Sequence, residues 1–307
     1  MNRRLAPIAF LAGMVLVACS SEGPQGATNT VAFIPDYQPG GGTTEVVPQG
    51  YTAATQPIVV TLGETDATHM FIDVAQSYAQ EGSVTFVVTN TGKETHEFVV
   101  LQTEKAAAAL PIVSFEGEPN RIDEEAPGVV NLGETGDMEP GTTIALTIDM
   151  AAGHYAAVCN LQGHYAMGMH QDFWVTPKGS TPVTVSLGET DATHMFVDLS
   201  QSTAPEGKVS FIVTNDGHQA HELVVLATDT PAAGFPITGF DGEPNRFDED
   251  AEGLTNVGET GDPAMEPGTS LMLTIDMAAG HYAAVCNLQG HYAMGMHQDF
   301  WVTGPPV

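Results

Sequence analysis

Residues 146–176 read LTIDMAAGHYAAVCNLQGHYAMGMHQDFWVT, and the same letters recur without one difference at residues 273–303. Because the repeat period is about the length of one domain, the sequence predicts a duplicated domain and not a solenoid of short repeats. We place the first domain at residues 57–177 and the second at residues 181–303. The connector Pro177–Pro182 is short and bounded by prolines, so the two domains should lie close together.

Each copy has the pattern of an all-β fold. Short runs rich in β-branched residues, such as Ile58–Leu62 and Val84–Thr89, are separated by turn sequences such as Asn90–Gly92. Strands of this length and spacing predict two tandem Greek-key β-sandwich domains. Only Gln102–Leu110, with its alanine run, has the pattern of a helix. It opens a long acidic excursion that reaches Met138, which is either a packed loop or a functional surface.

The charge of the chain speaks against a nucleic-acid partner. There are 38 aspartates and glutamates against 8 lysines and arginines, which gives a formal net charge of -30. A field of this sign repels phosphates and attracts cationic proteins or metal ions. The acidic surface fits either a high-salt habitat or a basic partner, and composition alone does not separate the two.

The N-terminus has the pattern of an export signal. Residues 1–18 begin with Arg3 and Arg4 and continue with the apolar run Leu5–Val17, which is too short to span a bilayer comfortably. The run ends in small residues directly before Cys19. This order resembles the lipobox of bacterial lipoproteins, in which the signal is cleaved before the cysteine and the thiol is acylated.

The lipobox resemblance implies a lipid anchor on Cys19 and an extracytoplasmic address, on the periplasmic face of a membrane or on the cell surface. The alternative is an ordinary secretory signal followed by a chance cysteine. Residues 19–56 are rich in Gly, Pro, Thr, Ser and Gln and show no sustained period. We therefore expect a flexible linker that tethers the folded domains to the membrane.

The remaining cysteines point to a metal. Cys159 and Cys286 occupy equivalent places, one in each copy, so neither has a disulfide partner within its own domain. A disulfide between the copies would need α-carbons within about 7 Å of each other. A lone thiol in an exported protein is otherwise an inert core residue or a metal ligand. The neighbours favour a ligand, because His164 follows Cys159 by five positions and Met169 follows His164 by five.

Thiolate, imidazole and thioether together suit copper in particular. Soft sulfur favours Cu(I), imidazole suits both oxidation states, and a weak axial thioether tunes the potential. A second nitrogen is still needed. His96 and His221 can supply it, since each follows an Asn-x-Gly turn at the head of a strand that a sandwich can bring beside the cysteine-bearing strand.

Cys159-x4-His164-x4-Met169 with the upstream His96 resembles the copper motif of the blue copper proteins, or cupredoxins. The spacing between cysteine and histidine is similar to that of the rusticyanin and sulfocyanin branch. The resemblance covers almost all of each copy and implies two type-1 copper sites per chain, one in each domain. The ligands that it implies are His96, Cys159, His164 and Met169 for the first site, and His221, Cys286, His291 and Met296 for the second.

Other methionines and histidines of each copy are not expected to be copper ligands. Met167 competes with Met169 for the axial position, but the family pattern places the ligand after Gly168. His154 and its copy His281 should lie on the surface, because strand alternation puts them on the face opposite the cysteine. We expect His69 and His194 at the surface as well, and the alternative for all four is a second metal site.

The cupredoxin resemblance implies electron transfer by cycling between Cu(I) and Cu(II), with redox partner proteins such as a cytochrome, an oxidase or a reductase. With the lipid anchor expected at Cys19, this cycling would take place at the outer face of a membrane. A multicopper enzyme would carry a histidine beside the cysteine, whereas Val158 and Asn160 flank Cys159 and no His-x-His occurs. We therefore expect no enzyme activity. Copper delivery, storage or tolerance stays open as the alternative, although no dense Met or His tract is present.

Overall fold

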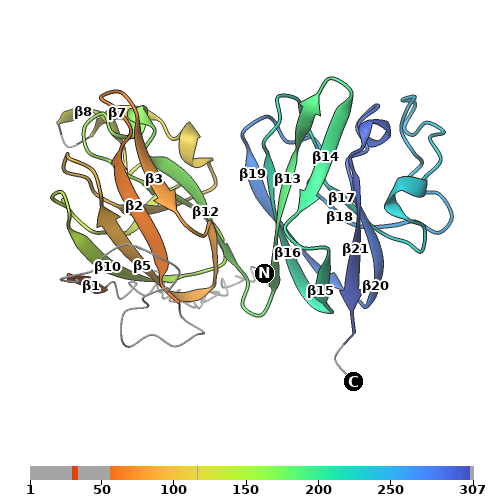
Figure 1. Cartoon of the computed structure of the whole chain (residues 1–307), viewed down its shortest axis with the longest axis horizontal. Helices are drawn as coiled ribbons and strands as arrows, with labels where there is room; N and C mark the ends of the chain where they lie inside the picture. Colours follow the sequence, from red (N-terminus) through yellow and green to blue (C-terminus); the bar gives the residue numbers. More distant parts are fainter. Residues whose placement is uncertain (1–29, 34–55, 116, 305–307) are drawn as a thin grey trace, which may run out of the picture.

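The computed structural model describes residues 30–33, 56–115 and 117–304. Within these residues the regular structure consists of β-strands and short 3-10 turns, with no α-helix. The strands form two β-sandwiches, one for each copy of the repeat (Figure 1). This confirms the predicted all-β fold class. Among the described residues, no helix has the length and apolar character needed to cross a membrane.

The first sandwich has two five-stranded sheets. One sheet has the order β1-β10-β5-β2-β3, with β1 (Thr30–Phe33), β10 (Thr143–Met150), β5 (Gly82–Asn90), β2 (Ile58–Glu64) and β3 (Met70–Val74). The other has the order β4-β12-β11-β6-β9, with β4 (Tyr78–Gln80), β12 (His170–Thr176), β11 (Gly153–Val158), β6 (Val99–Thr103) and β9 (Val129–Glu134). Strand β2 runs parallel to β5, so their ends lie beside each other near Asn90.

The second sandwich repeats this plan with one strand fewer. Its first sheet has the order β14-β13-β16-β19, with β14 (His194–Leu199), β13 (Thr181–Asp191), β16 (Gly207–Asn215) and β19 (Ser270–Met277). Its second sheet has the order β15-β21-β20-β17-β18, with β15 (Thr203–Pro205), β21 (His297–Thr303), β20 (Gly280–Val285), β17 (Val224–Ala227) and β18 (Thr255–Glu259). In the described residues no strand pairs with the outer edge of β19.

Strand β1 corrects one expectation. Thr30–Phe33 was assigned to the flexible linker, but it pairs antiparallel with β10, from Thr30 opposite Thr147 to Phe33 opposite Ile144. The reason is that β10 is otherwise an edge strand whose outer N–H and C=O groups need partners. The predicted signal at residues 1–18, and Cys19 with it, lie outside the described residues.

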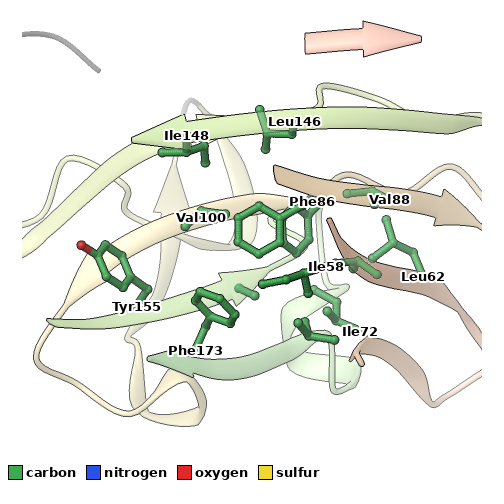
Figure 2. Close-up of a cluster of buried hydrophobic side chains, with 14 of the residues drawn as sticks. Ile58, Leu62, Ile72, Phe86, Val88, Val100, Leu146, Ile148, Tyr155 and Phe173 are labelled. Carbon is green, nitrogen blue, oxygen red and sulfur yellow. The ribbon is translucent and has the colours of Figure 1, made fainter. Parts of the chain in front are cut away.

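The core of the first sandwich lies between its two sheets (Figure 2). Phe86 packs with its ring centroid 5.2 Å from that of Phe98 and 5.3 Å from that of Phe173. These rings are fully buried, as expected of alternating residues on the inner faces of two packed sheets. Cys159 and Met169 belong to the same buried cluster. The Cys159 side chain is therefore part of the hydrophobic core and is not exposed at the surface.

The helix predicted at Gln102–Leu110 is wrong. Its first residues complete β6, and only Ala107–Ala109 form a 3-10 turn, η2. Tertiary hydrogen bonds take the backbone groups that a helix would use. The Ala107 N–H donates to Asp172 Oδ1 at 2.6 Å, and the Leu110 N–H donates to the Tyr165 hydroxyl at 3.0 Å. Packing has overridden the helix propensity of alanine.

The acidic excursion packs through the buried residues Ile122 and Val129, whereas most of its hairpin, β7 (Ile112–Phe115) and β8 (Glu118–Ile122), is exposed. It is fastened to the cysteine loop by the side chain of Asn160, which accepts from the Ile122 N–H at 2.6 Å and donates to the Ile122 C=O at 3.0 Å. The excursion thus covers one flank of the loop that carries Cys159 and His164.

Candidate metal centre

Cys159 and His164 lie on one loop at the end of the first sandwich. Cys159 follows β11 directly, and His164 precedes the 3-10 turn η3 (Tyr165–Met167). Backbone hydrogen bonds close this loop. The Cys159 N–H donates to the Met169 C=O at 3.1 Å, and the Met169 N–H donates to the His164 C=O at 3.2 Å. The loop conformation is therefore fixed by the chain itself.

His96 reaches the same place from the strand next to β11. It precedes β6 and exchanges two backbone hydrogen bonds with Met138, at 3.2 and 2.7 Å. The side-chain amide of Asn90 donates to the carbonyls of Met138 and Glu94, at 2.7 and 2.8 Å. Because β6 pairs with β11, this anchored turn delivers His96 beside Cys159.

Three ligand atoms converge in each copy. In the first copy His96 Nδ1 lies 3.2 Å from His164 Nδ1, and Cys159 Sγ lies 3.4 Å from His164 Nδ1. In the second copy the corresponding distances are 3.2 and 3.5 Å. In each group the ligand atoms all lie within 4.8 Å of one another. The equivalent residues of the second group are His221, Cys286 and His291.

The centre is almost closed to water. His96 and Cys159 are fully buried, and His164 is 9% exposed. The second copy has the same values. A dry group of one sulfur and two imidazole nitrogens fits a soft ion such as copper, because these are the donors that copper prefers. The edge of His164 is the part of the group that reaches the surface.

Burial also sets the protonation of these groups. It raises the pKa of the Cys159 and Cys286 thiols to about 12, because a thiolate in the dry core loses its hydration. Burial lowers the pKa of His164 and His291, and the neighbouring histidine lowers it further. Without an ion, each site thus holds a protonated thiol and a neutral imidazole. Binding a metal must displace the thiol proton.

Glu97, which sequence reasoning missed, supports the cysteine in two ways. Its backbone N–H donates to Cys159 Sγ at 3.4 Å, and its side-chain Oε1 accepts from the Asn160 N–H at 2.9 Å. Burial, with the nearby charges of Glu134 and Glu124, raises the pKa of Glu97 to about 7. Glu222 makes the same contacts in the second copy. The acid beside each histidine ligand was visible in the sequence, but nothing there distinguished it from the other acids.

Met169 is fully buried, whereas Met167 is half-buried and packs against the edge of the core. Gly168 between them has φ 109°, and a Cβ there would lie 2.9 Å from the Met70 carbonyl oxygen. Only glycine fits this turn without strain. The burial favours Met169 as the inner thioether. Its role as axial ligand, and that of Met296, stays a prediction.

The expectation for His154 and His281 is wrong, because these residues are only 5% and 8% exposed. His154 Nδ1 lies 2.7 Å from the Thr103 carbonyl oxygen, and Nε2 lies 2.8 Å from Asp172 Oδ1. Its ring packs on Trp174 at a centroid distance of 4.5 Å. The outer face of this sheet is therefore covered and not solvated. The expectation for the other pair, His69 and His194, is confirmed, since both are exposed.

Each copy thus combines a β-sandwich with a buried group of two histidines and one cysteine that could hold a metal ion. Residues 44–186 match the sulfocyanin (SoxE) domain family. This confirms the resemblance to the cupredoxins for the first copy, and the duplicated group His221, Cys286 and His291 gives the chain a second candidate copper site. No curated protein matches the chain.

Several solved structures, two copper enzymes among them, match this chain. A multicopper oxidase matches with a TM-score of 0.37 and 14% identity, over 81% of this chain and 89% of the oxidase. A copper nitrite reductase from Nitrosomonas europaea matches with a TM-score of 0.34 and 16% identity, over 81% and 94% of the two chains. Auracyanin from Roseiflexus castenholzii matches with a TM-score of 0.26 and 20% identity, over 40% of this chain and 97% of auracyanin.

Proposed function

We propose that the chain is an electron carrier with one type-1 copper site in each domain, which cycles between Cu(I) and Cu(II). The observation that carries this proposal is the convergence of two Nδ1 atoms and one Sγ in a dry, preassembled group that occurs twice. Copper held there would exchange single electrons with little movement of its ligands. The proposed ligands are His96, Cys159, His164 and Met169, and His221, Cys286, His291 and Met296.

The chain's own residues keep such a site rigid. Backbone hydrogen bonds fix Cys159 against Met169, and Asn90 fixes the turn that carries His96. The N–H of Glu97 donates to the sulfur and would lower its electron density. Because these contacts are made by groups of the protein itself, little rearrangement would be needed when the charge of the site changes.

The surroundings of the cysteine support a carrier over an enzyme. A multicopper enzyme needs a group beside the cysteine that leads to a second copper. Here Asn160 occupies that position, and its side chain is committed to the backbone of Ile122 and to Glu124 at 2.6 Å. This arrangement supports the absence of enzyme activity, which we include in the proposal.

We further propose that electrons enter and leave through the edge of His164, which reaches the surface beside the half-buried Leu161 and Met167. A small apolar patch of this kind suits brief contacts with a redox partner, such as a cytochrome, an oxidase or a reductase. A lipid anchor at Cys19 would hold the protein on the outer face of a membrane, where such partners can be met.

Spectroelectrochemistry of the copper-loaded chain tests the proposal. We expect both centres to be reduced and reoxidised reversibly by one electron each, with the copper retained against an excess of a Cu(I) chelator through many cycles. Rapid loss of Cu(I) to the chelator would instead favour copper delivery or storage. Turnover of nitrite, or of oxygen with an organic substrate, would contradict the carrier function.

A further inference from the structure

In each centre a glutamate carboxylate contacts Nε2 of the buried histidine, the ring nitrogen that faces away from the other ligand atoms. His96 Nε2 lies 2.9 Å from Glu64 Oε1, and His221 Nε2 lies 3.0 Å from Glu189 Oε2. Each glutamate precedes its histidine by 32 residues. The Glu64 side chain is 12% exposed and that of His96 is fully buried, so water barely reaches the contact.

Backbone hydrogen bonds and the shape of the neighbouring turn fix the position of the Glu64 side chain. Glu64 is the last residue of β2, and its carboxylate accepts from the Lys93 N–H at 2.9 Å and from the Glu94 N–H at 2.8 Å. A Cβ on Gly92 would lie 2.6 Å from Glu64 Oε1, so the turn admits the carboxylate only because residue 92 is glycine. In the second copy, Gly217 leaves the same space for Glu189.

The carboxylate decides which nitrogen of the histidine carries the proton. The Glu64 carboxylate accepts from the N–H groups of Lys93 and Glu94, and its Oε1 lies 2.9 Å from His96 Nε2. Because a carboxylate oxygen in this position is an acceptor, the His96 nitrogen that faces it is the N–H donor, which places the His96 proton on Nε2. The lone pair of Nδ1 is then directed to the side where Cys159 and His164 lie.

The carboxylate also places a negative charge beside a dry site. A negative charge close to a metal centre stabilises the more positive oxidation state, and this effect is large where water is excluded. The charge acts through the ligand histidine, since Glu64 contacts the ring nitrogen that faces away from the centre.

We propose that Glu64 and Glu189 are positioning residues that lock each buried histidine in the Nε2–H tautomer and bias each centre toward Cu(II), an inference that rests on the proposed copper function. Neither residue belongs to the predicted ligand sets. Their removal should leave the ligands in place and change the balance between the two oxidation states.

The test is the substitution Glu64→Gln in the full chain, because glutamine keeps the shape and an acceptor oxygen but removes the charge. We expect Cu(II) binding at the first site to weaken about tenfold more than Cu(I) binding. This corresponds to a rise of about 59 mV in the reduction potential of that site. The second site, with Glu189 intact, is the reference within the same molecule, so two separate potentials should appear. Glu189→Gln should move the other site alone.

Asp73→Asn is the matched control, because it removes one exposed negative charge from the strand that pairs with β2. The inference is overturned if both sites of Glu64→Gln keep the wild-type potential, or if Asp73→Asn produces the same shift. Should Glu64→Gln fail to fold, Glu189→Gln gives the same comparison with the first site as reference. A wild-type chain without a blue copper spectrum would instead overturn the proposed function itself.

Discussion

The substitution Gly168→Ala tests whether the loop geometry around Met169 is enforced by sterics. Gly168 has φ 109°, which costs an alanine about 1–2 kcal/mol. The new Cβ would also lie 2.9 Å from the Met70 carbonyl oxygen, and forcing such a contact apart costs about 1–3 kcal/mol. We therefore expect the first domain to lose about 2–5 kcal/mol of its free energy of unfolding.

The matched control is Gly141→Ala. Gly141 has φ 78°, but a Cβ there would meet no atom within 4 Å, so only the cost of the backbone conformation applies. Urea unfolding of the metal-free chain can be followed by tryptophan fluorescence in a Trp301→Phe background, where Trp174 on β12 of the first domain is the remaining tryptophan. If Gly168→Ala is no more destabilising than Gly141→Ala, the steric argument is wrong.

Three further predictions concern buried groups. Burial raises the pKa of Glu97 from 4.5 to about 7, so the stability that the protonated carboxyl contributes is full below pH 4.5 and is lost as pH rises through 7. The free energy of unfolding of the metal-free wild type should therefore fall relative to that of Glu97→Gln over this pH range. A constant difference between the two would count against the raised pKa. Copper uptake at pH 7 should release one proton per site, measured by calorimetry in buffers of different ionisation enthalpy, because both cysteine thiols have a pKa of about 12; uptake without proton release would mean that the thiols are already ionised. His154→Ala should lower the free energy of unfolding by about 2–4 kcal/mol, measured by thermal unfolding, since it removes two buried hydrogen bonds and a ring contact. The control His69→Ala, at an exposed site, should change it by less than about 0.5 kcal/mol. Equal effects would refute the structural role of His154.

Most of the fold could be predicted from local patterns. Strands such as Val84–Thr89 carry β-branched residues in runs bounded by turns. Because the domain is duplicated, the same strand pattern can be identified independently in both copies. The ligand loop was also visible, because Cys159, His164 and Met169 lie close together in sequence at a characteristic spacing. For the same reason the convergence of Cys159 and His164 needed no knowledge of long-range packing.

Long-range packing explains what the sequence did not reveal. Alternation correctly placed His154 on the face opposite Cys159, but only the folded chain shows that Trp174 and Asp172 cover that face. Glu64 is 32 residues from His96 and is one acid among many, so its contact depends on the parallel pairing of β2 with β5. Strand β1 is too short to show a period, and its structure comes from the edge of β10.

The central claim is that in each domain one sulfur and two imidazole nitrogens bind a single copper ion. Titration of Cu(II) into the wild-type chain, followed by optical absorption and electron-spin resonance, tests it most directly. We expect two equivalents to bind with an intense sulfur-to-copper absorption, one equivalent to remain coloured in Cys159→Ser, and none in Cys159→Ser with Cys286→Ser. Colourless binding by the wild type, or unchanged colour in the double variant, would contradict the claim.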